Sequence, residues 1–133
     1  MAANGSNTLV NFNVDRQTGL LSTSQCFNQA GTLGCSVGLG LTAPKRVRVC
    51  ENARCVLVSA GDGMAVFTRS TKTGALTQPG GVAVPCWNST GTLGCTSAPA
   101  LHGAMGIDSI SGGIKQIYVA GSNDDAVSEF HLH

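Results

Sequence analysis

The sequence predicts an all-β protein made of repeated sheet units, and three observations lead to this prediction. Residues 31–35 read Gly-Thr-Leu-Gly-Cys and recur at 91–95, and each final cysteine has a second cysteine nine positions upstream. A pattern that begins with Asn or Asp and ends in Phe occurs three times, at 7–12, 62–67 and 125–130. The chain has 18 glycines in 133 residues, and only 11% of its residues are charged. Motifs that recur at similar distances along a chain indicate one supersecondary unit that is stacked on copies of itself.

Nine segments are predicted to be strands, because short apolar or alternating runs there are bounded by Gly, Asn, Asp, Ser and Pro. They are Thr8–Val14, Leu20–Ser24, Lys45–Cys50, Cys55–Ala60, Met64–Arg69, Ala75–Gln78, Met105–Ile110, Gln116–Ala120 and Ala126–Leu132. Two long connections rich in Gly and Thr, at 25–44 and 84–103, each carry a cysteine pair. We expect a covalent bridge to order each connection, since loops of this length are uncommon in compact domains.

Composition and charge exclude several partner classes. The net charge of +1 gives no reason to expect nucleic acid or an anionic membrane as a partner. No apolar run approaches the roughly 18 residues that a membrane span requires. Residues 1–5 have neither the basic start nor the apolar segment of a signal peptide, so none is predicted in this chain.

The six cysteines form three pairs that are close in sequence. The repeat makes Cys26 and Cys35 equivalent to Cys86 and Cys95, so the simplest scheme bridges each pair within its own loop. Cys50 and Cys55 flank a predicted hairpin turn, where a bridge is possible between directly opposed residues. Metal binding and free thiols are the alternatives, but zinc ligands usually come in tighter spacings. Disulfides predict an oxidising compartment, outside the cell or at its surface.

The middle of the chain resembles a known repeat. Residues 56–69, followed by 73–77, resemble the repeat of the lactonase-like seven-bladed β-propellers. Residues 117–121 resemble the first portion of this repeat, and residues 12–19 resemble its second portion. The resemblance implies β-propeller-like blades of four-stranded antiparallel sheet, about two repeats plus a partial third. The single domain 1–133 would divide into a partial blade at 1–44, a full repeat at 45–104 and a partial repeat at 105–133. The cysteine loops resemble those of a secreted or cell-surface subset of the family.

Nine strands are far fewer than the about 28 that a closed seven-bladed propeller contains. The chain is therefore expected to be a fragment, a short form that closes differently, or a subunit that completes a ring with its copies. A small self-contained sandwich is the remaining alternative. If the chain self-associates, we expect Thr8–Val14 to pair beside Ala126–Leu132 of a neighbour, because strands at the end of a repeat stack leave pairing edges.

Candidate binding residues are few. Arg46 and Arg48 share one strand face and form either an anion-binding surface or an ordinary solvent-facing one. Trp87 either packs on the neighbouring disulfide or presents an aromatic surface to a sugar. His131 and His133 share a strand face but have no third ligand nearby, so no metal site is predicted, and no cofactor.

No catalytic residue emerges from the sequence. Ser59 and Ser128 lie outside any recognisable nucleophile motif, and Asp62, Asp124 and Asp125 fit turn caps better than a calcium loop. The favoured function is a non-catalytic extracellular binding module or self-assembling structural module. A fragment or subunit of a lactonase-like propeller hydrolase is the alternative, and it would need a cluster of ionisable groups.

The repeat also predicts the core. The three equivalent phenylalanines should be buried at equivalent positions, together with apolar residues of the neighbouring strands. These residues are Phe12, Phe67, Phe130, Val58, Val119, Leu21 and Leu76.

Overall fold

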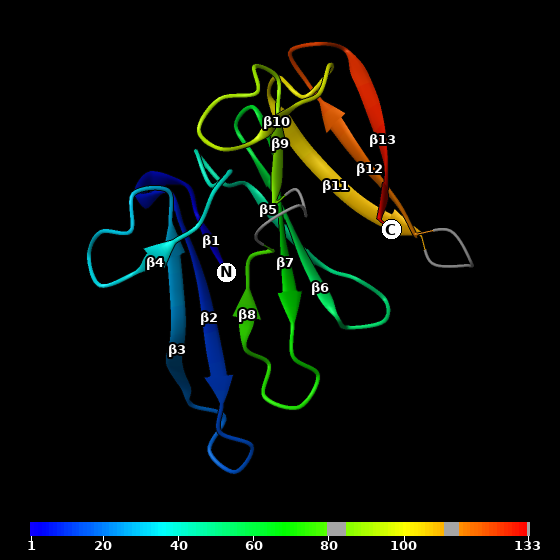
Figure 1. Cartoon of the computed structure of the whole chain (residues 1–133). Coiled ribbons are helices and arrows are strands. Elements are labelled where there is room, and N and C mark those ends of the chain that lie inside the picture. Colours follow the sequence, from blue (N-terminus) through cyan, green and yellow to red (C-terminus); the bar gives the residue numbers. More distant parts are fainter. Residues whose placement is uncertain (80–84, 111–114, 133) are drawn as a thin grey trace.

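The computed structural model describes residues 1–79, 85–110 and 115–132. Within these ranges the protein is all-β, apart from one 3-10 turn at Asn4–Ser6. The strands form three sheets, which we call sheets A, B and C in chain order and which lie side by side (Figure 1). The described residues contain no helix that is long and apolar enough to cross a membrane.

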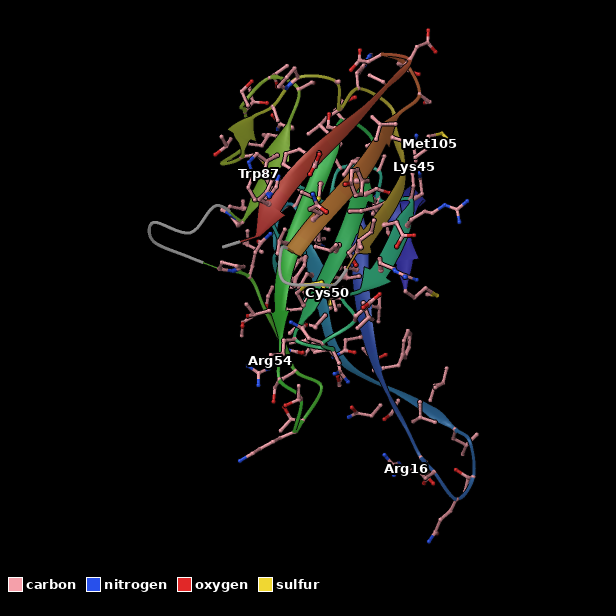
Figure 2. All side chains as sticks on the ribbon, turned by 90° about the vertical axis from the view of Figure 1, so that its right-hand side faces the viewer. Arg16, Lys45, Cys50, Arg54, Trp87 and Met105 are labelled. Atoms are coloured by element: carbon pink, nitrogen blue, oxygen red, sulfur yellow. A yellow bond between two sulfur atoms is a disulfide. The ribbon has the colours of Figure 1, made fainter. Side chains whose placement is uncertain are left out.

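Sheet A lies at the N-terminal end of the chain, and its strands follow the order β1-β2-β3-β4. These strands are β1 (Ala2–Ala3), β2 (Thr8–Val14), β3 (Leu21–Asn28) and β4 (Ser36–Val37). The β2–β3 hairpin extends beyond the other two sheets, with Arg16 at its tip (Figure 2). A β-bulge interrupts its register between Asn11 and Phe12.

Sheet B is the central layer, with the order β10-β9-β7-β6-β5 and with β8 paired to β7. Its strands are β5 (Arg46–Val49), β6 (Cys55–Ala60), β7 (Gly63–Arg69), β8 (Leu76–Thr77), β9 (Cys86–Asn88) and β10 (Thr96–Ser97). Sheet C is an antiparallel meander of β11 (Ala104–Ile110), β12 (Lys115–Gly121) and β13 (Ala126–Leu132).

The central strands of sheet B are buried on both faces, since residues 56–60 of β6 and 63–67 of β7 are all buried and Ser59 is the one polar side chain among them. Val56, Val58 and Phe67 join an apolar cluster with Leu9 and Phe27 of sheet A. The alternate residues Leu57, Met64 and Val66 join a second cluster with Ile117 and Val119 of sheet C. Successive side chains of a strand point to opposite faces, so a continuous apolar run suits a strand covered on both sides.

The all-β prediction is confirmed, and each predicted strand overlaps an observed one. A uniform four-stranded antiparallel unit is not confirmed, because among the described residues sheet A has four strands, sheet B six and sheet C three. The short pairings β3–β4 and β9–β10 are also parallel. The sheets span residues 2–37, 46–97 and 104–132, close to the three predicted repeat segments. They form no closed ring within the described ranges, so propeller blades stay a prediction.

The core prediction is right for Phe67, Val58, Val119 and Leu76, which are buried. Three further residues were predicted to be buried and are not: Phe12 and Phe130 are only half-buried, and Leu21 is exposed. Phe12 and Leu21 belong to the projecting hairpin, on the face of sheet A that no other sheet covers. Phe130 lies in β13, at the edge of sheet C, so one side of its ring remains near solvent.

The three predicted disulfides are confirmed, and the chain has no free cysteine. Cys26 bonds to Cys35, Cys50 to Cys55, and Cys86 to Cys95. Each bridge closes a single loop or turn and none joins two sheets, so the contact between sheets depends on apolar packing and hydrogen bonds. The three bridges indicate an oxidising compartment.

Candidate functional site

The two loops that carry the duplicated motif lie against each other. A Cβ on Gly94 would lie 3.1 Å from Leu39 Cδ1, and a Cβ on Gly40 would lie 2.6 Å from Cys86 Cβ. The chain that follows the first disulfide loop therefore packs directly on the second. Gly40 has a φ of +76°, so both its backbone conformation and the space around it require glycine.

An asparagine organises each loop from inside. Asn28 Oδ1 accepts a hydrogen bond from the Thr32 N–H at 3.0 Å, and its Nδ2 donates to the Thr32 carbonyl oxygen at 2.9 Å. Asn88 repeats both bonds with Thr92, at 3.2 and 2.8 Å. Neither asparagine was predicted from the sequence, although each lies two positions after the first cysteine of its loop and the two share the repeat spacing. Together with the disulfides, these bonds fix the loop backbone.

Each loop presents a leucine in a conformation that is unusual for this residue type. Leu33 has a φ of 58° and Leu93 a φ of 57°, in the left-handed region. This conformation costs an L-residue with a Cβ roughly 1–2 kcal/mol. Leu33 is 87% exposed and Leu93 60% exposed, so little packing offsets the cost. Strained exposed residues of this kind cluster at binding sites, which makes the two leucines candidate contact residues.

A shallow pocket of about 90 Å³ lies between the two loops, over the β6–β7 turn. Its lining includes Gln29, Thr42, Asp62, Asn88, Thr92 and Leu93. The volume is well below the about 300 Å³ of small-molecule sites. The pocket suits one polar side chain of a partner, or a few water molecules, better than a complete substrate.

Three loops from different parts of the chain meet beside the pocket. His102 Nε2 lies 3.4 Å from Asp62 Oδ1, which joins the β10–β11 loop to the β6–β7 turn. The backbone N–H of His102 donates to Asp124 Oδ2 at 2.8 Å, which adds the β12–β13 turn. Asp62 and Asp124 therefore connect neighbouring loops. The imidazole and the Asp62 carboxylate are both about half exposed, so the pair is accessible from solvent.

The predicted ligand-surface residues do not form one surface. Trp87 lies on β9 and the two arginines on β5, on opposite sides of β6 and β7 within sheet B. Figure 2 shows the same separation between Trp87 and Lys45, which directly precedes β5. Arg48 Nε lies 3.0 Å from Asp108 Oδ1 of sheet C, so Arg48 pairs within the protein, while Arg46 is exposed.

Trp87 packs between sheets. Its ring lies 5.3 Å from that of Phe130, at an angle of 51°, and it adjoins the cluster between sheets B and C. Cys86 belongs to the opposite cluster, because consecutive strand residues point to opposite faces. Packing on the adjacent disulfide, one of the two roles considered for this residue, is therefore wrong.

The described residues hold no arrangement that is typical of catalysis. Ser128 donates its hydroxyl hydrogen bonds to the carbonyl oxygens of Pro99 and Ala100, at 3.0 and 3.3 Å. Ser59 is fully buried. His131 lies 3.2 Å from Glu129, and His133 is outside the described residues. No group of three His, Cys, Asp or Glu side chains suited to a metal occurs within the ranges described.

Ser59 gives a first testable prediction. Its Oγ is buried in the layer between sheets B and C and has no hydrogen-bond partner, so folding desolvates the hydroxyl without compensation. We expect Ser59→Ala to leave the free energy of unfolding unchanged or to raise it by up to about 1–2 kcal/mol. Chemical denaturation measures the change. A clear loss of stability would mean that the hydroxyl bonds to a partner.

Comparison with protein-family models, curated proteins and solved structures finds no match to this chain. The resemblance to lactonase-like propellers therefore stays a prediction.

Proposed function

We propose that this chain is a non-catalytic extracellular module that binds a protein partner through its duplicated disulfide loops and associates with copies of itself. The observation that carries the proposal is the pair of exposed, left-handed leucines, Leu33 and Leu93, on two loops of the same construction. A leucine at the tip of a rigid loop offers apolar area with little loss of entropy on binding, since disulfide and asparagine already fix the backbone.

The pocket between the loops adds a polar contact. Asp62 and Asn88 line it next to Leu93. Apolar anchors beside a few polar groups are typical of protein-binding surfaces, in which a small number of residues provide most of the affinity. Trp87 also lines the pocket. Its ring packs against that of Phe130 between sheets, so we favour a protein over a sugar as the partner.

The hydrolase alternative has less support. A lactone hydrolase needs a nucleophile or activated water beside groups that stabilise the oxyanion. In the described part of the chain, Asp62 and His102 form one pair, and Arg48 and Asp108 another on a different edge. A panel of aliphatic and aromatic lactones tests this alternative directly, and we expect no hydrolysis above the buffer rate. Turnover that Asp62→Asn abolishes would favour the hydrolase.

The two leucines give a stability prediction. Asn adopts the left-handed conformation more readily than Leu, so the double variant Leu33→Asn/Leu93→Asn should be more stable by about 1 kcal/mol. Thermal and chemical denaturation measure the gain. A loss of stability would mean that the leucines pack within the folded protein and do not serve as contacts.

The same variant tests binding. Peptides selected from a displayed library on the immobilised protein should bind the unmodified chain and lose at least tenfold in affinity with Leu33→Asn/Leu93→Asn. Leu20→Asn is the matched control, because Leu20 is also exposed but lies at the tip of the β2–β3 hairpin. Equal affinity of the selected peptides for all three proteins would contradict the loop-binding proposal.

A further inference from the structure

The outer face of sheet A is mainly apolar, and no other sheet of the described residues covers it. We define it by Met1, Val10, Phe12, Val14 and Leu21, which point away from sheet B. Leu9 points into the cluster with sheet B. Val10 and Phe12 lie one and three positions further along the same strand, so their side chains point to the opposite side. Met1 pairs with Val10, and Leu21 with Val14, across the sheet. Strands β1, β2 and β3 contain no charged side chain.

In the rest of the molecule the equivalent face is a contact between sheets. Phe67 of sheet B points toward sheet A, with its ring 5.1 Å from that of Phe27. Phe130 of sheet C points toward sheet B, with its ring 5.3 Å from that of Trp87. Phe12 holds the same place in the repeated pattern, but no sheet of the described residues packs against it. The outer face of sheet A therefore has the kind of surface that packs against another sheet elsewhere in the molecule.

The other end of the stack has a different surface. Gln116 and Glu129 lie on the outward side of sheet C, opposite to the buried Ile117 and Val119. Gln116 Nε2 donates to Glu129 Oε1 at 2.7 Å, and His131 Nε2 lies 3.2 Å from the same oxygen. Burial of these groups under a sheet would desolvate a carboxylate and an imidazole. The same side of sheet C also carries the exposed Ile110 and Val127, but these ionisable groups make it a poor partner for an apolar sheet.

We propose that the outer face of sheet A is the interface of a symmetric dimer, in which it packs against the same face of a second copy. The inference deepens the proposed self-association. Because the polar end of sheet C is a poor match for an apolar face, the best complement in a second copy is sheet A itself. A contact between identical faces closes after two copies. The assembly is therefore a dimer, in place of the ring or fibre that pairing of terminal strands would give.

The edges of the sheets also favour a contact between faces over the pairing of terminal strands. Strand β2, which the sequence analysis expected to pair with a neighbouring copy, lies between β1 and β3, and β1 covers its edge at Thr8 and Leu9. Edge pairing with Ala126–Leu132 of another copy is therefore blocked along part of β2, whereas the outer face remains open.

Sedimentation velocity over a wide range of protein concentrations tests the dimer. We expect a species of twice the 13.5 kDa monomer mass. Val14→Lys/Leu21→Lys should shift it to monomer, with at least a hundredfold weaker association, because two copies would bring four lysines together. These side chains are 60% and 62% exposed in the single chain, so the fold should persist, which circular dichroism checks. Val127→Lys, on the outward side of sheet C and 67% exposed, is the matched control and should stay dimeric.

Three results would overturn the proposal: a monomer at every concentration, species that grow beyond two copies, or dissociation of the dimer by Val127→Lys. The loop-binding part of the proposed function is tested separately. Leu33→Asn/Leu93→Asn should leave the dimer intact, and a monomeric protein that still binds the selected peptides would refute self-association but not binding through the loops.

Discussion

Phe67→Ala is expected to unfold the protein or nearly so, with a loss of about 3–5 kcal/mol in the free energy of unfolding. Phe67 is fully buried in the central sheet and packs against Phe27 of sheet A. Its truncation leaves a cavity between two sheets that no disulfide joins, so little resists their separation. A domain of this size is typically stable by about 5–15 kcal/mol, so this one residue contributes a large share.

Chemical denaturation measures the loss, and Phe12→Ala is the matched control. Phe12 is the equivalent residue of the first repeat but is half-buried on the outer face of sheet A. Its truncation should cost less than half as much when measured on the monomer. A loss below about 1 kcal/mol for Phe67→Ala would be typical of a surface site and would contradict the assignment of this face to the core.

The second large effect is expected from the Cys86–Cys95 bridge. Disulfides stabilise a protein by about 2–4 kcal/mol, mainly through constraint of the unfolded chain. Both cysteines of this bridge are buried and belong to the cluster between sheets A and B. Cys86→Ala/Cys95→Ala therefore removes the constraint and also opens space beside Gly40, so we expect a loss at the upper end of that range or beyond.

The repeat provides a control with the same loop length. Cys26 and Cys35 lie nine positions apart in the sequence, as do Cys86 and Cys95, so the constraint on the unfolded chain is equal. Cys26 and Cys35 are only half-buried. Cys26→Ala/Cys35→Ala should thus lower the free energy of unfolding only through the lost constraint on the unfolded chain. Equal losses for the two double variants, measured by chemical denaturation without reductant, would contradict a role for the buried sulfurs in packing.

Local features of the chain could be predicted from the sequence. The disulfides follow from the equivalence of the two loops, and β6 and β7 follow from apolar runs bounded by turn residues. The short strands β4, β9 and β10 could not be found this way, because only two or three residues of each form pairs. Strand β4 pairs with the end of β3, and β9 pairs with both β10 and β7. They depend on the loop geometry that Asn28 and Asn88 impose.

Burial was harder to predict than strand position. The repeat aligns Phe12 with Phe67, but burial depends on whether a sheet lies next to that face. Sequence periodicity indicates which face a residue occupies and does not indicate what covers it. The candidate contact residues were missed for a related reason, since a left-handed backbone at a leucine has no sequence pattern of its own.

The three sheets are consecutive in the chain, which has a consequence for how the protein folds. Sheet A lies within residues 2–37, sheet B within 46–97 and sheet C within 104–132, and among the described residues no strand of one sheet is inserted into another. During synthesis each sheet is complete before the next one emerges, so folding proceeds layer by layer from the N-terminus. Sheet A must wait for sheet B to cover Leu9 and Phe27, and sheet B in turn waits for sheet C. Because most pairings join strands that are neighbours in sequence, folding should be fast for an all-β chain, with the docking of layers as its slowest step.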